Sequence, residues 1–487
     1  MTAVETERFP TRLIIHGEPV EASSGKSFGV VNPATEATIA HVAEAGVDDV
    51  HRAVESARRT FESDAWRSLS ARGRGQMLYR LGELCLAHKD ELARLETLNN
   101  GKPIFESAID LRLTAETFMY YGGWADKVYG ETIPVDGPFL NYTLREPLGV
   151  IGAIVPWNFP MSLAAWKIGP ALACGNTIVL KPSEETPFTA LRMAELALEA
   201  GFPAGAFNCV PGPGRVAGMA LVQHEGVDKI AFTGSTEVGK EIMRAAAGTV
   251  KKMSMELGGK SPNIVYADAD LDAAARGALT GIFYGKGEVC AAGSRLLVEA
   301  EIEDALRGKM LERARKMVAG DPLNPKTRLG AIVSKAQMER VLGYIESGRK
   351  EGATLLTGGE RVPVNGKGYF VAPTIFGDVD PGMTIAREEI FGPVLAMMTF
   401  RGGMDGAIPL ANDTIYGLAA GIWTRDIKKA LRTARAVRAG TVWVNTYNMY
   451  DAGSPFGGYK QSGFGRELGS YALDGYTQVK SVWVDLS

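Results

Sequence analysis

The chain has 487 residues, too long for one hydrophobic core, so we expect two or three domains. Its 53 basic and 56 acidic residues leave a net charge of −3 without long runs of either sign, which indicates neither a nucleic acid nor an anionic membrane as partner. Its four cysteines, Cys85, Cys174, Cys209 and Cys290, show no C-x-x-C spacing, and the histidines form no paired motif. We therefore expect a reducing, cytoplasmic compartment and no metal site.

Two segments bear on targeting and membranes. Residues 1–8 are acidic and lack an apolar stretch, so no secretory signal is expected. Residues 147–166 carry no charge and are long enough to suggest a membrane span. Pro156, Asn158 and Pro160 interrupt that stretch, so a buried strand followed by a loop is expected there instead.

The first third of the chain combines short strands with amphipathic helices. Residues 13–20 have the pattern of a strand and a turn. Apolar residues recur at helical spacing in 47–63 and again in 75–98, which predicts helices that cover a core. The turn dipeptide Asp136-Gly137 lies between residues of strand character, so 128–144 is predicted to form a hairpin.

From residue 149 onward, short apolar runs alternate with helical ones. The predicted strands are 150–155, 177–181, 207–210 and 229–233, and the predicted helices are 161–174, 186–200, 215–224 and 236–246. Repeated βαβ units predict an α/β fold with a parallel sheet covered on both faces. Ligands bind beyond the carboxyl ends of such strands, which directs attention to the turns at 156–159, 181–184, 211–214 and 234–239.

A second α/β segment follows residue 290. Helices are predicted near 303–317 and 335–350, and a strand at 441–445. The last stretch, 476–486, ends in Val482-Trp483-Val484, a strand without an obvious partner nearby in the sequence. Such a strand is a candidate for pairing across a subunit interface.

Cys290 is the first candidate for chemistry. A helical run at 271–283 ends before two glycines, Gly285 and Gly287, and a strand is predicted at 296–298, so Cys290 should lie on a turn. A thiol on a glycine-bounded turn can be approached by a substrate and a cofactor. The alternative is a small buried apolar residue, as most free cysteines are.

Two glycine-rich turns could bind phosphate. Gly212-Pro213-Gly214-Arg215-Val216-Ala217 matches the dinucleotide fingerprint, but no acidic residue follows at the expected distance. Gly234-Ser235-Thr236-Glu237-Val238-Gly239 is the better candidate, because it opens a helix whose free N–H groups suit an anion and Ser235 adds a hydroxyl. The alternative is that Ser235 is an ordinary helix cap.

Four other side chains have both a chemical and a structural interpretation. Lys181 and Glu184 could bind ribose hydroxyls, with Glu184 repelling a 2′-phosphate and so favouring NAD over NADP, or they could form a solvated ion pair. Glu256 could be a buried general base or a surface carboxylate beside a turn. Asn158 could donate to a developing oxyanion or cap the following helix.

Together these motifs resemble the NAD(P)-dependent aldehyde dehydrogenases of the non-acylating, cysteine/glutamate type, over essentially the whole chain from about residue 10. The similarity rests on Pro156-Trp157-Asn158-Phe159, Lys181-Pro182-Ser183-Glu184, Phe232-Thr233-Gly234-Ser235-Thr236, Glu256-Leu257-Gly258-Gly259-Lys260, Gly287-Glu288-Val289-Cys290, Glu389-Ile390-Phe391-Gly392-Pro393 and Pro455-Phe456-Gly457-Gly458. The order of these motifs, and the 34 residues from Glu256 to Cys290, are similar to those of the family.

The resemblance implies roles for five catalytic residues. Cys290 would attack the aldehyde carbon to give a thiohemiacetal, with Asn158 and the backbone N–H of Cys290 holding the oxyanion. Glu256 would activate the water that hydrolyses the later thioester. Lys167 and Glu467 would relay the proton away.

The resemblance also implies the ligands and where they bind. NAD would be held by Trp157, Lys181, Glu184, Gly214, Gly234, Ser235, Gly258, Glu389 and Phe391. The substrate channel would be lined by Phe159, Leu163, Trp166, Tyr284, Val289, Tyr450 and Phe456. That aromatic, uncharged tube favours an aliphatic or aromatic aldehyde over a dicarboxylic semialdehyde, which would need an arginine, and leaves a betaine-type aldehyde as an alternative because aromatic faces attract cations.

The implied architecture is a Rossmann-type cofactor domain, an α/β catalytic domain and a small β element for oligomerisation. Residues 1–125 and 148–258 would form the NAD-binding domain, 259–458 the catalytic domain, and 126–147 with 459–487 the bridging segments of a homodimer or homotetramer. A CoA-acylating enzyme is a rival that Glu256 argues against. A non-catalytic homologue is a further alternative that retention of both Cys290 and Glu256 argues against.

Two residues depart from the family pattern. Glu288 stands where glutamine is usual, and it could raise the pKa of Cys290 if it points inward. Gly285 stands where asparagine is usual and could widen the substrate entrance. Both changes leave the expected activity in place but make its rate and specificity harder to predict.

Overall fold

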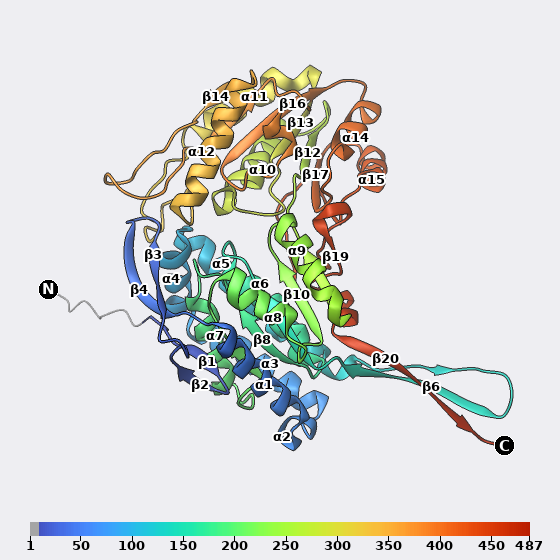
Figure 1. The fold of residues 1–487 in the computed structure, drawn as a ribbon. Helices are drawn as coiled ribbons and strands as arrows, with labels where there is room; N and C mark the ends of the chain where they lie inside the picture. Colours follow the sequence, from blue (N-terminus) through green and yellow to red (C-terminus); the bar gives the residue numbers. More distant parts are fainter. Residues whose placement is uncertain (1–8) are drawn as a thin grey trace.

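A computed structural model describes residues 9–487, so residues 1–8, on which the expected lack of a secretory signal rests, lie outside the described part. Figure 1 shows two lobes, each built around one β-sheet, and a narrow arm that projects away from them. The arm carries the C-terminus. The predicted α/β class is therefore confirmed, with one large sheet in each lobe and a small β-sheet in the arm.

The first lobe contains an eight-stranded sheet in the order β19-β11-β10-β7-β8-β9-β1-β2. Its strands are β1 (Leu13–Ile15), β2 (Glu18–Val20), β7 (Val150–Ile154), β8 (Thr177–Lys181), β9 (Phe207–Cys209), β10 (Lys229–Thr233), β11 (Lys252–Glu256) and β19 (Gly463–Phe464). Strands β7 to β11 are parallel, and their order reverses between β7 and β10. Such a reversal is where ligands bind in open α/β sheets.

Helices cover both faces of this sheet. They are α1 (Val47–Glu62), α6 (Pro160–Ala173), α7 (Phe188–Glu199), α8 (Met219–Gln223) and α9 (Thr236–Ala246). In β8, Ile178 and Leu180 join the core that includes α6 and α7, whereas Val179 joins the core that includes α1 and α8. Successive strand residues point to opposite faces, so an uninterrupted apolar strand is what a doubly covered sheet requires.

The predicted elements of this lobe are confirmed to within two residues, with two exceptions. Within the predicted helix 215–224, the stretch Gly214–Gly218 forms a π-helical turn that precedes α8. The predicted helix 75–98 is two helices, α3 (Ala71–Ala87) and α4 (Lys89–Asn100), because the backbone leaves helical geometry at His88. The remaining elements here are β3 (Ser27–Asn32), β4 (Ala37–Ala43), α2 (Asp64–Arg67) and α5 (Ile104–Trp124).

The second lobe holds a seven-stranded sheet in the order β14-β15-β16-β13-β12-β17-β18. Its strands are β12 (Pro262–Val265), β13 (Arg295–Glu299), β14 (Thr354–Thr357), β15 (Thr374–Gly377), β16 (Val394–Phe400), β17 (Ala419–Trp423) and β18 (Thr441–Val444). Its helices are α10 (Leu271–Phe283), α11 (Glu303–Ala314), α12 (Lys335–Lys350), α13 (Thr384–Arg387), α14 (Met404–Asn412) and α15 (Ile427–Ala436). In β13, Leu296 and Val298 pack with α10 and α11, and Leu297 packs with α12 and α14.

The arm is a three-stranded antiparallel sheet of β5 (Thr132–Ile133), β6 (Phe139–Pro147) and β20 (Thr477–Asp485). The predicted hairpin is confirmed. The C-terminal strand does have a partner in its own chain, since β20 pairs with β6 from Thr477 opposite Pro147 to Asp485 opposite Phe139. The partner is therefore distant in the sequence, and the candidate pairing across a subunit interface is replaced by this pairing within the chain along the length of β20. Strand β19 belongs to the predicted bridging segment 459–487, but it pairs with β11 and so is part of the sheet of the first lobe.

Between residues 9 and 487, no helix is long and apolar enough to cross a membrane. The uncharged stretch 147–166 forms the end of β6, then β7, a loop and the start of α6. The same described residues contain no group of three or more His, Cys, Asp or Glu side chains placed to hold a metal ion.

Candidate active site

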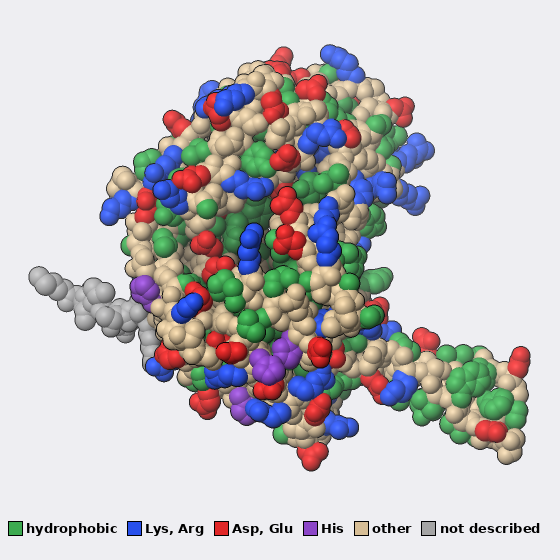
Figure 2. Space-filling view, in the orientation of Figure 1, with side chains coloured by type: hydrophobic (Ala, Val, Ile, Leu, Met, Phe, Trp, Pro, Cys, Tyr) green, Lys and Arg blue, Asp and Glu red, His purple; other side chains and the backbone are tan. Residues whose placement is uncertain are grey.

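Two cavities meet at Cys290. The first, which we call the inter-lobe cavity, has a volume of about 580 Å³ and is lined by turns of the first lobe and by α12 and residues 388–391 of the second. The other, the aromatic cavity, has a volume of about 320 Å³. Within the described chain, Cys290 is the one residue in the walls of both. Figure 2 shows the surface hollowed between the lobes, with acidic and basic side chains around the hollow.

Cys290 lies on the turn that the sequence predicted. Helix α10 ends at Phe283, and Gly285 and Gly287 adopt positive φ angles that lead the chain to the cysteine. Cys290 is partly exposed, whereas Cys85, Cys174 and Cys209 are buried, so it is not a core residue. Desolvation, together with the charges of Glu389 and Glu256, raises the pKa of the Cys290 thiol. The thiol is therefore protonated at neutral pH until something favours the thiolate.

Asn158 follows β7 and points at the loop that carries the cysteine. Its Nδ2 donates to the backbone oxygen of Glu288 at 2.9 Å, and its buried Oδ1 has no partner. The next helix, α6, is capped at Phe159 without a side-chain hydrogen bond, so Asn158 is not a helix cap. One amide N–H of Asn158 is thus anchored while the other is free to donate.

Glu256 ends β11 and is buried, not a surface carboxylate. Neither of its carboxylate oxygens has a hydrogen-bond partner. Burial raises its pKa well above the usual range, Glu467 raises it further, and Lys167 opposes both. Glu256 lines neither cavity; a Cβ built on Gly457 would lie 2.8 Å from its Oε1. Glu256 therefore has the environment of a general base, and glycine at position 457 leaves its carboxylate the room it occupies.

Lys167 and Glu467 form a buried ion pair beside Glu256. The ammonium of Lys167 contacts Oε1 of Glu467 and donates to Oγ1 of Thr233 at 2.6 Å. The other carboxylate oxygen of Glu467 is buried without a partner. The pKa of Glu256 responds to both residues, which places the pair within electrostatic reach of it.

Six of the nine predicted cofactor residues line the inter-lobe cavity: Trp157, Gly234, Ser235, Gly258, Glu389 and Phe391. Lys181, Glu184 and Gly214 do not. Lys181 ends β8 and pairs with Glu184 at 3.0 Å, so the ion pair considered from the sequence exists. Lys181 is nevertheless buried and Glu184 is 44% exposed, so the ion pair is not fully solvated. Gly214 begins the π-helical turn.

The inter-lobe cavity has the donors and acceptors that a dinucleotide needs. Ser235 caps α9, with its Oγ accepting from the N–H of Val238 at 3.3 Å, and the start of this helix faces the cavity. Oε1 of Glu389 accepts from the N–H of Gly259 at 2.9 Å, and burial raises the Glu389 pKa to about 7. A Cβ on Gly258 would overlap the Glu389 carboxylate, so glycine at this position lets that carboxylate lie where it bonds to Gly259. A helix N-terminus for phosphate and a carboxylate for sugar hydroxyls therefore fit such a ligand.

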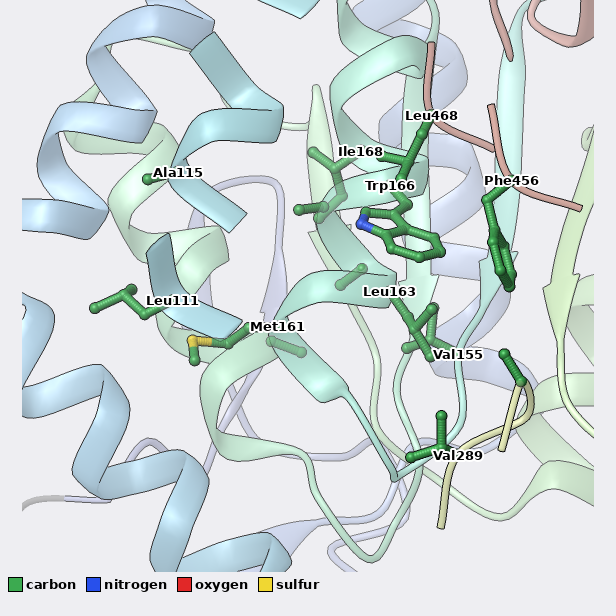
Figure 3. Close-up of a cluster of buried hydrophobic side chains, with 14 of the residues drawn as sticks. Leu111, Ala115, Val155, Met161, Leu163, Trp166, Ile168, Val289, Phe456 and Leu468 are labelled. Atoms are coloured by element: carbon green, nitrogen blue, oxygen red, sulfur yellow. The ribbon is translucent and has the colours of Figure 1, made fainter. Parts of the chain in front are cut away.

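All seven predicted substrate residues line the aromatic cavity: Phe159, Leu163, Trp166, Tyr284, Val289, Tyr450 and Phe456. Trp166 and Phe456 lie with ring centroids 5.5 Å apart, and Figure 3 shows them facing each other near Leu163 and Val289.

The expectation that this tube is uncharged is wrong, because Asp110 and Arg112 also line it. Asp110 is buried and paired with Lys102 at 2.5 Å, whereas Arg112 is 63% exposed and lies 3.5 Å from Glu116.

Several residues of the inter-lobe cavity were not predicted. Gln337, Arg340 and Tyr344 of α12 share one helical face toward the cavity, as their spacing allows. The spacing of these three residues was visible in the sequence. Nothing in the sequence indicated that this face of α12 lies against the first lobe or which ligand it would contact.

Glu288 does not point at the thiol. Its carboxylate pairs with Lys286 at 2.8 Å and accepts from the N–H of Val333 at 3.0 Å. The conditional expectation that Glu288 raises the Cys290 pKa therefore does not apply, since Glu389 and Glu256 are the carboxylates that raise it. At Gly285, an added Cβ would lie 3.0 Å from Val289 and 3.6 Å from Phe159, beside the aromatic cavity.

The structure is thus that of a two-lobed α/β protein in which one partly exposed cysteine lies in the walls of two cavities. A model of the aldehyde dehydrogenase family matches residues 20–482. The chain belongs to this family and is an aldehyde dehydrogenase, as the sequence resemblance predicted.

Relatives and solved structures agree with this assignment. The chain is 49% identical over 484 residues to the mitochondrial aldehyde dehydrogenase of Sus scrofa, covering 99% of this chain and 92% of that one. A structure of the aldehyde dehydrogenase of Bacillus cereus with NAD+ has a TM-score of 0.98, 49% identity and coverage of 100% and 99%. An indole-3-acetaldehyde dehydrogenase with NAD+ has a TM-score of 0.97, 47% identity and coverage of 98% and 97%.

Proposed function

We propose that this enzyme oxidises an aliphatic or aromatic aldehyde to the carboxylic acid through a thioester on Cys290, with NAD+ as the oxidant. The position of Cys290 in the walls of both cavities carries the proposal. One reacting sulfur can then meet an aldehyde from the aromatic cavity and a cofactor from the inter-lobe cavity.

In the first half of the reaction the Cys290 thiol loses its proton to solvent, and its sulfur forms a bond to the aldehyde carbon as the carbonyl π bond breaks. The carbonyl oxygen takes the negative charge and accepts from the free N–H of Asn158 and the backbone N–H of Cys290. Losing one such donor typically lowers turnover ~10²–10³-fold. NAD+ bound in the inter-lobe cavity would supply the oxidising chemistry as a hydride acceptor, and Cys290 would then carry the acyl group as a thioester.

In the second half Glu256 removes a proton from water, and the water oxygen attacks the thioester carbon. The carbon–sulfur bond breaks, the acid leaves, and Cys290 is regenerated. Lys167 and Glu467 pass the proton of Glu256 onward. The raised pKa of Glu256 supports this role, because a base is most effective when its pKa lies near the working pH. Prompt hydrolysis at Glu256 also disfavours transfer of the acyl group to CoA.

NAD+ is proposed over NADP+. Trp157, Ser235 and Glu389 would hold it along the inter-lobe cavity, and Lys181 with Glu184 would hold the adenosine ribose. The Glu184 carboxylate disfavours a 2′-phosphate through charge repulsion. Two similar proteins are named as NAD+ complexes, which supports the same cofactor here.

The aromatic walls support an apolar aldehyde. Arg112 is exposed and already beside Glu116, so it is a poor anchor for the second carboxylate of a semialdehyde. A betaine-type substrate is the second candidate, because the cavity has six aromatic side chains and a betaine aldehyde dehydrogenase of Staphylococcus aureus is 40% identical with a TM-score of 0.96.

The remaining proposals concern assembly and location. The arm exposes Leu144, Val479 and Trp483, and such a surface supports a homodimer or homotetramer in which the arm contacts another subunit. The unpaired cysteines support a reducing compartment such as the cytoplasm. We retain the domain boundaries of 1–125 with 148–258, 259–458, and 126–147 with 459–487 as part of this proposal.

The test is NADH formation across a panel of alkyl, aryl, semialdehyde and trimethylammonium aldehydes, with NAD+ and NADP+. Wild type, Cys290→Ala and the matched control Cys174→Ala are compared. Turnover that Cys290→Ala abolishes and Cys174→Ala retains is the expected result. NAD+ binding without turnover on any aldehyde would instead identify a catalytically weakened NAD-binding homologue.

A further inference from the structure

Three consecutive residues before Cys290 adopt left-handed backbone geometry, with φ of 57° at Gly285, 60° at Lys286 and 72° at Gly287. Glycine takes this geometry readily, but a residue with a side chain rarely does. Lys286 is also buried, 1% exposed, so its ammonium is out of water as well. Two unfavourable features at one lysine indicate that its side chain makes compensating interactions.

Three oxygen atoms surround the ammonium of Lys286, and two of them accept hydrogen bonds from it. It lies 2.8 Å from Oε2 of Glu288, 2.6 Å from Oδ1 of Asn100 and 3.1 Å from the backbone oxygen of Asn100. The second carboxylate oxygen of Glu288 accepts from the N–H of Val333. The buried ammonium of Lys286 therefore has two hydrogen-bond acceptors and one ionic partner, and Oε2 of Glu288 contacts that ammonium as an ion pair without a hydrogen bond.

These contacts continue into the loop that carries Asn158. The side chain of Asn100 donates from Nδ2 to the backbone oxygen of Trp157 at 2.8 Å. The neighbouring Asn158 donates from its own Nδ2 to the backbone oxygen of Glu288 at 2.9 Å. The path from Glu288 through Lys286, Asn100, Trp157 and Asn158 returns to Glu288, so it is a closed ring. We call these five residues the Lys286 network.

We propose that Lys286 and Glu288 are positioning residues that hold the amide of Asn158 in register with Cys290. The inference rests on the proposed function, in which Asn158 and the Cys290 backbone N–H hold the oxyanion. The ring ties the two loops that carry these donors, and oxyanion donors act only when they lie within about 2.7–3.1 Å of the developing charge. Glu106 adds a second anchor, accepting from the N–H of Gly285 at 3.2 Å.

The two charges are needed together. Removing one partner of a buried ion pair leaves the other charge unpaired, whereas replacing both by neutral groups of similar shape removes that penalty. Glu288→Gln or Lys286→Gln alone should therefore displace the loops more than the double variant, in which two amides can still hydrogen-bond to each other, to Asn100 and to Val333.

The experiment measures the rate of the NADH burst, the NAD+ affinity and iodoacetamide labelling of Cys290. The variants are Lys286→Gln, Glu288→Gln and the double variant. Asn100→Ala opens the ring at Trp157 without removing a charge from the pair, and serves if a single charge variant does not fold. Lys429→Gln is the matched control, because it breaks an ion pair with Asp268 at 2.9 Å that lies outside both loops. Circular dichroism confirms folding.

Each single variant is expected to lower the burst rate about 10- to 100-fold, because small misplacements of catalytic groups cost that much. NAD+ affinity should change little, and the double variant should recover to within about threefold of wild type. Asn158→Ala should cost far less in the Lys286→Gln background than in wild type, which a purely structural role for Lys286 would not produce.

Strict additivity of Lys286→Gln with Asn158→Ala would overturn the inference. So would folded single variants with wild-type burst and labelling rates, or a double variant worse than either single one. A wild-type enzyme that oxidises no aldehyde would refute the proposed function instead, and labelling of Cys290 would still report whether the network holds the loop.

Discussion

Lys167 and Glu467 stand 300 residues apart in the chain, yet the ammonium of one contacts the carboxylate of the other where both are buried. Lys167 comes from α6 of the first lobe, and Glu467 from the segment that returns after the second lobe. The ion pair lies at the end of β10, because Lys167 also donates a hydrogen bond to Thr233, the last residue of that strand. The pair thus joins the end of the chain to the centre of the first sheet.

Glu467→Gln should lower both stability and turnover. The substitution leaves the Lys167 ammonium buried and uncompensated, which typically costs about 3–5 kcal/mol of the free energy of unfolding. We expect kcat to fall about 10- to 100-fold with an unchanged KM for aldehyde, since proton transfer by a positioned group contributes at least that much. Denaturant unfolding and steady-state kinetics measure the two effects. A folded variant with wild-type kcat would show that the pair is not part of the relay.

Glu256→Gln should separate the two halves of the reaction. Stopped-flow measurements should show an NADH burst close to one per active site, followed by steady-state turnover ~10²–10⁴-fold slower, because hydrolysis of the thioester lacks its base. Burial raises the Glu256 pKa, and a base must be unprotonated, so the wild-type hydrolysis rate should rise with pH through that raised pKa. The variant should lose this rise. Loss of the burst itself would place Glu256 in the first half instead.

The affinity for NAD+ should depend on pH through Glu389. Its pKa is raised to about 7 by burial, and its carboxylate form accepts hydroxyl hydrogen bonds better than its protonated form. The KM for NAD+ should therefore fall as pH rises from 6 to 8, by about three- to tenfold. Glu389→Gln should weaken NAD+ binding and remove this dependence, as fluorescence titration would show. An unchanged pH profile in the variant would exclude Glu389 as its origin.

Glu184→Gln should relax the choice of cofactor. The variant removes a carboxylate, 44% exposed, from the place proposed for the adenosine ribose. We expect kcat/KM with NADP+ to rise about tenfold, a modest gain because solvent screens the charge. Activity with NAD+ should fall by a smaller factor. Glu195→Gln, on the surface of α7, is the control. If the ratio of kcat/KM with NADP+ to kcat/KM with NAD+ stays constant in Glu184→Gln, residues other than Glu184 distinguish the two cofactors.

Removing β20 should disrupt the assembly. A chain ending at residue 476 would leave β6 without the partner it pairs with along its whole length and would expose Asn141, which is buried against Ser481 and Val482. We propose that the intact protein is a dimer or tetramer, and light scattering should then show monomers or aggregates for the shortened chain. An intact oligomer of the shortened chain would show that the interface lies outside the arm.

The local elements were largely predictable. Residues 177–181, 229–233, 236–246 and 335–350 form the expected strands and helices with the expected ends. Hydrophobic periodicity and caps act within a few residues, so the sequence contains them directly. The break at His88 was missed because α3 and α4 both continue the same apolar periodicity.

The reacting groups were also visible in the sequence, since Cys290, Glu256 and Asn158 each stand on a short motif with recognisable chemistry. The sequence did not reveal which charged side chains form ion pairs with one another. Lys286 lies between Gly285 and Gly287, yet its contact with Glu288 follows from the left-handed turn of the cysteine loop, and its bond to Asn100 follows from the way α4 packs against that loop.

The sequence alone therefore determined the class of fold, the secondary structure of both lobes and the identity of the candidate nucleophile. Only the tertiary structure decided that Glu288 points away from the thiol, that charged residues join the wall of the aromatic cavity, and that β20 pairs with β6. The physical reason is that hydrophobic periodicity shows which residues of one helix or strand face the core. Contacts between residues distant in the sequence depend instead on how whole helices and strands pack against one another.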